Sequence, residues 1–183
     1  YQPSADPNGA GVAYMISGGW ASSLPMQGAY ESMFLPLVDA GFTVFAVRHG
    51  SSPRYNVLEA YNDVALAFQK IGAIAPGYGV DPERIGVSGI SAGGHLSLML
   101  GLRSDYKPEG DDGSNSHRPA AVVSYMPPTD LRGMTELVAG DPLGERDRRV
   151  VGALEQLAQV SAAVLVEQLV LDGGEILRGW RQK

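Results

Sequence analysis

Cysteine is absent from this sequence of 183 residues, which excludes disulfide bonds, thiolate metal sites and a cysteine nucleophile. No apolar run reaches the length of about 18 residues that a membrane-spanning helix needs. Basic residues are in the minority, with 14 Lys and Arg against 20 Asp and Glu. The net charge of −6 leaves no basic patch for nucleic acid or an anionic membrane. None of these absences fixes the cellular compartment or the oligomeric state.

Histidine is scarce as well. The chain has only His49, His95 and His117, so a function that needs a histidine must use one of these three. Nothing in the sequence indicates a metal or a cofactor, and we expect neither. The composition, 44% hydrophobic and 19% charged, is ordinary for a folded domain, and the length predicts one domain over residues 1–183. The first residue is Tyr rather than Met, which indicates a mature form or a fragment, and no histidine follows His117. We therefore expect a domain that is incomplete at both ends.

Apolar segments alternate with helical patterns along the first two thirds of the chain. Short apolar segments bounded by Gly, Pro or polar residues predict strands at residues 12–16, 43–47, 84–88 and 120–125. Apolar residues at helical spacing predict helices at 30–40, 57–71 and 92–102, and Pro36 predicts a kink or a late start in the first of these. This alternation is typical of an α/β fold, a mostly parallel sheet with helices on both faces.

The C-terminal third has a different pattern. Residues 103–118 are polar and predict a loop. Residues 146–166 carry apolar positions at helical spacing after a charged stretch, and they predict one amphipathic helix in a divergent tail over 132–183.

Gly89-Ile90-Ser91-Ala92-Gly93 has the pattern of a nucleophile elbow, in which a strained turn between a strand and a helix presents a serine hydroxyl. Its context agrees, because an apolar segment precedes it and helix-forming residues follow it. The alternative is a glycine-rich loop without chemistry.

A second glycine pair, in Ser17-Gly18-Gly19-Trp20, follows the first predicted strand. Consecutive glycines allow backbone N–H groups to turn toward an anion, as an oxyanion hole requires. Alone, such a pair usually forms only a turn. Its position after the first predicted strand and before the elbow supports the oxyanion interpretation.

With these motifs the chain resembles the α/β-hydrolase fold, and within it the esterase/lipase-like group that includes acetyl-xylan and feruloyl esterase-like enzymes. The resemblance covers residues 11–131. Its blocks are Ser17-Gly18-Gly19-Trp20, Phe45-Ala46-Val47-Arg48-His49-Gly50, residues 79–87, Gly89-Ile90-Ser91-Ala92-Gly93-Gly94-His95 and Met126-Pro127-Pro128-Thr129-Asp130-Leu131. Ser17 stands where the group usually has histidine.

The resemblance implies a serine hydrolase that cleaves a small-molecule carboxylic ester through an acyl-enzyme, or alternatively a peptidase. Ser91 would be the nucleophile. The oxyanion would be held by the N–H of Ala92 and by those of Gly18, Gly19 or Trp20.

The acid and the base are harder to assign, since the fold places them after the serine, acid first. His95 lies one helical turn beyond Ser91, so we expect it in the core. His117 precedes a strand and should lie about 20 Å from the catalytic edge. His49 ends a strand at that edge. The strand order of the resembled group places it about 10 Å from Ser91. Its candidate roles are a pocket-lining residue, a turn residue or a substitute base.

Asp130 follows the last predicted strand and is the candidate acid, although a turn or cap role is the alternative. Asp172 is a second candidate. Truncation, a shifted reading frame or a loss of catalysis would each explain the missing histidine loop. The alternative function is therefore a non-catalytic or truncated hydrolase domain that retains a binding pocket.

Overall fold

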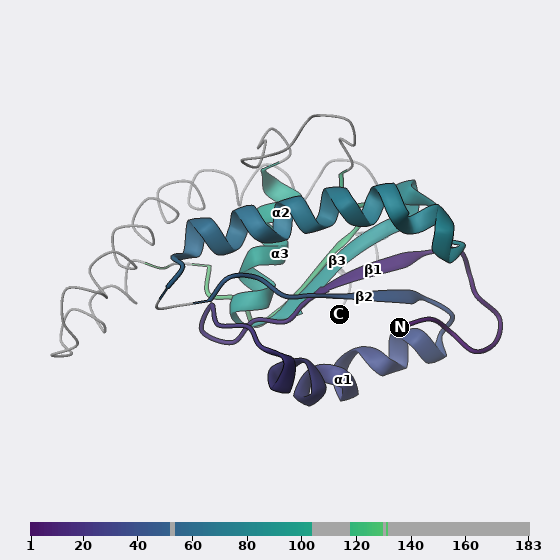
Figure 1. Cartoon of the computed structure of the whole chain (residues 1–183), viewed down its shortest axis with the longest axis horizontal. Coiled ribbons are helices and arrows are strands. Elements are labelled where there is room, and N and C mark those ends of the chain that lie inside the picture. The colour runs from purple at the N-terminus through teal and green to yellow at the C-terminus, as the bar shows by residue number, and fades with distance from the viewer. Residues whose placement is uncertain (52–53, 104–117, 130, 132–183) are drawn as a thin grey trace, which may run out of the picture.

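A computed structural model of the chain describes residues 1–51, 54–103, 118–129 and 131 (Figure 1). Four parallel strands form one sheet in the order β2-β1-β3-β4. Their bounds are β1 Gly11–Met15, β2 Thr43–Val47, β3 Ile85–Ile90 and β4 Val122–Tyr125. Parallel neighbours need crossover connections, and the intervening helices supply them.

The register places two strand ends side by side. β1 and β3 are direct neighbours, and Met15 pairs with Gly89. The segments that follow these two strands therefore leave the same edge of the sheet, the edge at which open α/β sheets bind ligands. Because β1 lies between β2 and β3, the end of β2 is two strand positions from the end of β3, as the resemblance predicted.

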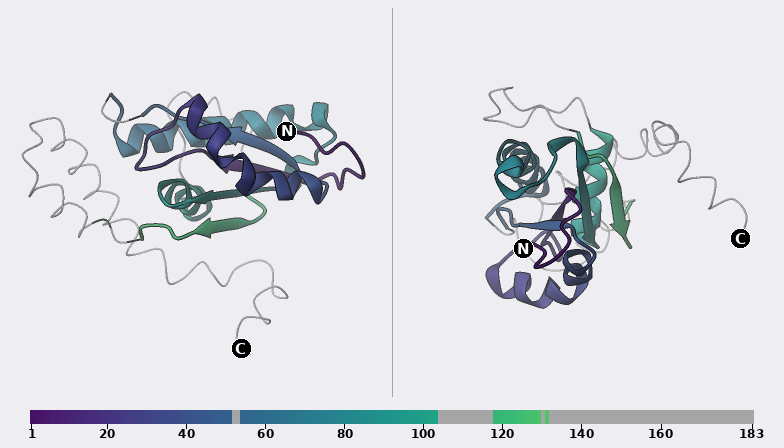
Figure 2. Two further views of the ribbon diagram at one scale, coloured as in Figure 1. Left: turned by 90° about the horizontal axis from the view of Figure 1, so that it is seen from below. Right: turned by 90° about the vertical axis from the view of Figure 1, so that its right-hand side faces the viewer.

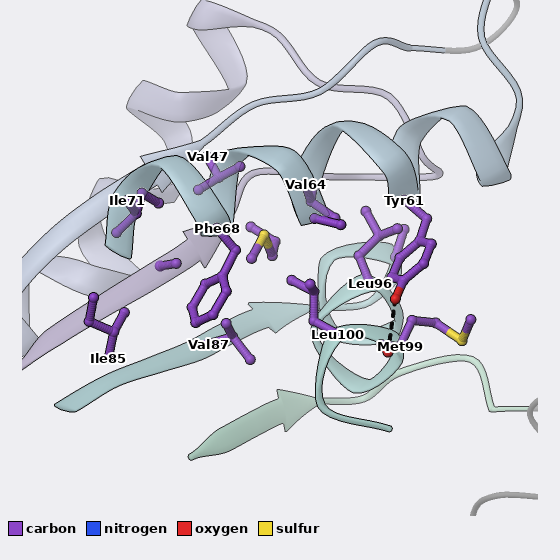
Figure 3. Close-up of a cluster of buried hydrophobic side chains, with 14 of the residues drawn as sticks. Val47, Tyr61, Val64, Phe68, Ile71, Ile85, Val87, Leu96, Met99 and Leu100 are labelled. Atoms are coloured by element: carbon purple, nitrogen blue, oxygen red, sulfur yellow. Dashed lines mark hydrogen bonds between the residues drawn. The ribbon is translucent and has the colours of Figure 1, made fainter. Parts of the chain in front are cut away.

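Helices cover both faces of the sheet (Figure 2). α1 (Leu24–Asp39) packs through Phe34 against Tyr14, Ile16 and Val44 on one face. α2 (Val57–Ile74) and α3 (Ala92–Leu102) cover the other face, where alternate strand positions point into a larger core. Figure 3 shows this core, in which side chains of α2 and α3 meet the strands. Its labelled members are Val47, Tyr61, Val64, Phe68, Ile71, Ile85, Val87, Leu96, Met99 and Leu100.

Capping residues explain where two helices begin. Asn56 and Glu59 form a capping box at the start of α2, each side chain accepting from the other residue's backbone N–H. Ser23 caps α1, its hydroxyl accepting from Met26 N–H at 3.3 Å. α1 therefore begins at Leu24 rather than near residue 30, and it continues through Pro36 as one helix. Of the two effects expected of Pro36, the late start was wrong, and the kink stays a prediction.

The structure confirms the predicted parallel α/β architecture: β2 has the predicted bounds, and those of the other three described strands differ by at most two residues. The predicted helix at 92–102 matches α3 at both ends. α2 extends to Ile74 and continues into a 3-10 turn at Ala75–Tyr78, and a second one spans Pro82–Arg84. None of the described helices is long and apolar enough to cross a membrane. Most of the predicted loop at 103–118 and the whole predicted helix at 146–166 lie outside the described residues.

Candidate active site

The serine of the expected elbow lies between β3 and α3. Ser91 has φ 54° and ψ −121°, a positive-φ conformation whose cost to a residue with a Cβ is about 1–3 kcal/mol. Its backbone N–H donates to the Tyr125 carbonyl at 2.8 Å, and its carbonyl accepts from the His95 N–H at 2.9 Å. The residue is exposed. This strained, solvent-facing serine has the geometry that the Gly-x-Ser-x-Gly pattern predicts.

Glycines allow the elbow because backbone segments meet around it. A Cβ on Gly89 would lie 2.6 Å from the carbonyl group of Gly93, and a Cβ on Gly93 would lie 2.5 Å from the Met15 carbonyl oxygen. A Cβ on Gly94 would lie 2.7 Å from Ser124 Oγ. Side chains do not tolerate such approaches, so the glycines are needed for α3 to sit against the ends of β1 and β3.

The second glycine pair forms a tight turn after β1. Gly18 and Ala21 exchange two backbone hydrogen bonds of 3.0 Å each. Gly19 and Trp20 at the tip have φ of 56° and 55°, the left-handed pair of a type I′ turn. Among the described residues, the N–H groups of Gly19 and Trp20 have no acceptor. The Gly18 N–H already donates to Ala21, so only two of the three donors expected in this turn are free.

The remaining expected donor belongs to Ala92, the first residue of α3. The first N–H groups of a helix have no acceptor inside the helix, and its dipole places partial positive charge there. Within the described part of the chain the Ala92 N–H has no acceptor. It follows Ser91 directly, which suits it to stabilise negative charge on a group bound to Ser91.

His95 lies in the core, as expected for its position one turn into α3. Its Nδ1 accepts a hydrogen bond from the Trp20 indole N–H at 3.4 Å. Burial lowers the pKa of His95 to about 4, so the ring is neutral at neutral pH. No hydrogen bond among the described residues joins His95 to Ser91 Oγ, in agreement with the sequence analysis.

His49 follows β2 and is buried at the same edge of the sheet. Its Nδ1 lies 2.7 Å from the Gly50 carbonyl, and because a carbonyl only accepts, Nδ1 carries the proton. In the described structure its buried Nε2 has no partner, and burial lowers the pKa of the ring. His49 makes no hydrogen bond to Ser91 there.

Two contacts that hold the loop after β2 were missed from the sequence. The Asp63 carboxylate accepts from the Gly50 N–H at 2.7 Å. Ser51 Oγ accepts from the Ser22 N–H at 2.7 Å and donates to the Ser22 carbonyl at 2.9 Å, tying this loop to the segment after β1. Ser22 and Ser51 are 29 positions apart, and no local pattern connects them.

Three candidate acid and base residues lie outside the part of the chain that the structure describes: Asp130, His117 and Asp172. The segment before Asp130 does leave β4 at the edge that carries Ser91, because Tyr125 at the end of β4 accepts from Ser91.

The sheet order, the elbow and the glycine turn define an α/β-hydrolase fold of the esterase type. The BD-FAE family model matches residues 1–166, and the chain belongs to that family.

The chain is also similar to curated relatives and solved structures of carboxylic ester hydrolases and esterases. The Mycobacterium tuberculosis protein named "Probable carboxylic ester hydrolase LipM" is 30% identical over 128 residues, which are 68% of this chain and 30% of that protein. The Thermogutta terrifontis esterase Est2 with propionate bound gives a TM-score of 0.56 at 27% identity, over 66% of this chain and 46% of that one. Esterase 2 of the same species phosphonylated by cyclosarin gives 0.59 at 25% identity, over 80% and 54%. The chain thus spans less than a third of this curated relative and about half of these structures.

Proposed function

We propose that this chain performs the acyl-transfer chemistry of a serine carboxylic-ester hydrolase, with Ser91 as the nucleophile. The conformation of Ser91 carries the proposal, since an exposed serine is held at a strained positive φ at the junction of β3 and α3. Strain of this kind persists only where the surrounding structure enforces it, and it gathers at functional sites. Membership of the BD-FAE family and the esterase relatives support the same chemistry.

The proposed reaction has two halves. Ser91 Oγ bonds to the acyl carbon, and the carbonyl oxygen, now negative, accepts from the N–H groups of Gly19, Trp20 and Ala92. The carbonyl then re-forms as the carbon–oxygen bond to the alcohol breaks, and the alcohol leaves with the proton that the Ser91 hydroxyl has lost. Water attacks the acyl-enzyme, releases the carboxylic acid and restores the Ser91 hydroxyl. A small-molecule ester is the substrate.

We retain Asp130 as the acid that the resemblance implies and His49 as a pocket-lining residue. Since neither the His49 ring nor the His95 ring hydrogen-bonds to Ser91 Oγ in the described structure, we expect slow turnover by the 183-residue chain. An oxyanion hole and substrate binding without a complete triad still give about 10³–10⁴-fold catalysis over water. Activated aryl esters should therefore react measurably, and alkyl esters hardly at all.

The second candidate function is binding of an ester or acid without turnover. It is favoured by the positions of the two described histidines, because neither the His95 ring nor the His49 ring makes a hydrogen bond to Ser91 Oγ in the described structure. Under this alternative the elbow and the turn would form a pocket in which Ser91 contacts the ligand and no acyl-enzyme forms.

Hydrolysis of p-nitrophenyl acetate by the purified chain and by Ser91→Ala separates the two functions. The hydrolase proposal predicts a parent rate about ten- to hundredfold above that of the variant, far below the about 10⁶-fold effect seen in a complete triad enzyme. Equal rates, together with unchanged binding of propionate or acetate, would establish the binding function instead.

A further inference from the structure

Trp20 and His95 connect the two elements that carry the proposed oxyanion donors, although they are 75 positions apart in the sequence. The Trp20 indole N–H donates to His95 Nδ1 at 3.4 Å. The two rings also meet edge to face, with centroids 5.6 Å apart and an interplanar angle of 82°. Both side chains are buried. The contact therefore joins the tip of the turn after β1 to the first turn of α3.

The hydrogen bond fixes the form of the histidine ring. An indole N–H only donates, so His95 Nδ1 is unprotonated and the neutral ring carries its proton on Nε2. Burial, which keeps the pKa of His95 low, favours this neutral form. Among the described residues Nε2 has no partner, so the one hydrogen bond that this ring makes there goes to Trp20.

Both ends of the contact are attached to donor groups. Trp20 contributes its own backbone N–H and follows Gly19, and its φ of 55° is unfavourable for a residue with a Cβ. The indole contact helps to offset that cost. His95 lies one turn after Ala92, and its N–H bond to the Ser91 carbonyl begins the helix at the elbow.

We infer that Trp20 and His95 form a positioning pair, whose hydrogen bond and ring contact hold the N–H groups of Gly19 and Trp20 at a fixed distance from the N–H of Ala92. The inference rests on the proposed function, because it assigns these N–H groups to the oxyanion. Neither ring touches the reacting atoms. Their effect is on placement, and a displacement of about 1 Å in such a site can lower the rate by about 10²-fold.

The test is the Ser91-dependent hydrolysis of p-nitrophenyl acetate, which is the rate of each protein less the rate of its Ser91→Ala form. Trp20→Phe keeps an aromatic ring and removes the N–H donor. His95→Leu removes the acceptor at similar volume, and His95→Asn restores one, since its side-chain oxygen can accept from the indole. Tyr61→Phe is the control, because it deletes another buried bond to α3, from the Tyr61 hydroxyl to the Met99 carbonyl at 3.3 Å.

We expect Trp20→Phe and His95→Leu to lower kcat by about tenfold or more with KM within about twofold, since only charge in the transition state is affected. The double variant should fall no further than either single variant, because both remove the same contact. His95→Asn should recover most of kcat. Tyr61→Phe should lower the melting temperature and leave kcat unchanged.

An activity-independent readout accompanies the kinetics. In a ¹H–¹⁵N spectrum the Trp20 indole N–H should exchange slowly in the parent and in His95→Asn, and rapidly in His95→Leu. A parent kcat in Trp20→Phe, or an equal loss in His95→Asn and His95→Leu, overturns the positioning role while the hydrolase proposal stands. A parent rate equal to that of Ser91→Ala overturns the hydrolase proposal, and the positioning role with it.

Discussion

The centre and the flanks of the sheet edge are built in different ways. The central segments are residues 16–21 after β1 and, after β3, Ser91 with the start of α3. They are held by glycines and residues of positive φ, and they leave the backbone N–H groups of Gly19, Trp20 and Ala92 without acceptors in the described structure. The two flanking loops differ from them. Residues 48–51, after β2, are held by side-chain hydrogen bonds, and residues 126–129, after β4, lead toward Asp130. Backbone groups capable of stabilising an anion are thus in place at the centre, while the titratable groups lie at the flanks or in the core.

This difference shows which half of a catalytic site a short segment can specify. An elbow and a tight turn depend on local sterics and on the register of two neighbouring strands. A general base must instead arrive from a segment far along the chain, and it is useful only within about 3 Å of the nucleophile.

The largest expected effect is on the central packing. Gly93→Ala should lower the free energy of unfolding by more than about 3 kcal/mol, or prevent folding, because its Cβ would collide with the Met15 carbonyl. Gly28→Ala is the matched control, since Gly28 lies in α1 and a Cβ there meets nothing within 4 Å. That control should stabilise by about 0.5–1 kcal/mol. Urea denaturation measures both, and an equally mild effect of the two substitutions would show that the central packing is not rigid.

The next prediction compares the two histidines through pH. Burial lowers the pKa of His95 from 6.5 to about 4. As the pH falls, the His95 ring therefore takes up a proton in the unfolded chain before it does so in the folded chain. The folded state loses stability as the pH falls from 6.5 toward 4. At about 1.4 kcal/mol per pKa unit the loss is about 3 kcal/mol. His95→Asn should remove this part of the pH dependence, and His49→Asn should remove a smaller part in the same direction. Denaturation across this pH range would contradict the comparison if His49→Asn had the larger effect.

At the flank, Asp63→Ala should lower stability by about 1–2 kcal/mol, because the Gly50 N–H loses a charged acceptor. Asp63→Asn keeps an acceptor oxygen and should lose less. Neither change should alter the reaction of Ser91, since Asp63 supports the loop after β2 and not the central segments. A loss of Ser91 reactivity in Asp63→Ala would show that flank and centre are coupled.

The smallest effect is expected from relief of strain at the centre. Ser91→Gly should raise stability by about 1 kcal/mol, because the relief of strain at a positive φ exceeds the entropy that glycine adds to the unfolded chain. Ser91→Ala keeps the Cβ and should give no such gain. If calorimetry gave both variants the same melting temperature as the parent, Ser91 would not be strained.

Much of the centre could be predicted from the sequence. The Gly89 and Gly93 spacing around Ser91, the apolar strand before it and the helix after it are local signals, and they placed α3 at both ends. The Gly18-Gly19 pair predicted the turn after β1. Its hydrogen bonds could not be predicted, so the use of the Gly18 N–H by Ala21 was missed.

Contacts across the fold were harder to predict. The Trp20–His95 bond and the Ser22–Ser51 bonds join residues that meet only after the sheet has formed. The start of α1 was also missed. Its early residues have no strong apolar period, so the sequence pattern did not show that the helix begins at the Ser23 cap and continues through Pro36.

The most direct test of the central claim is to map where a fluorophosphonate probe reacts. The chain is incubated with excess probe, digested, and read by mass spectrometry over time, with Ser91→Ala in parallel. We predict slow labelling at Ser91 alone, with none in the variant, because the proposed nucleophile and oxyanion donors have no imidazole hydrogen-bonded to Ser91 Oγ in the described structure. Labelling spread over other serines at the same rate, or none at Ser91, would contradict the account.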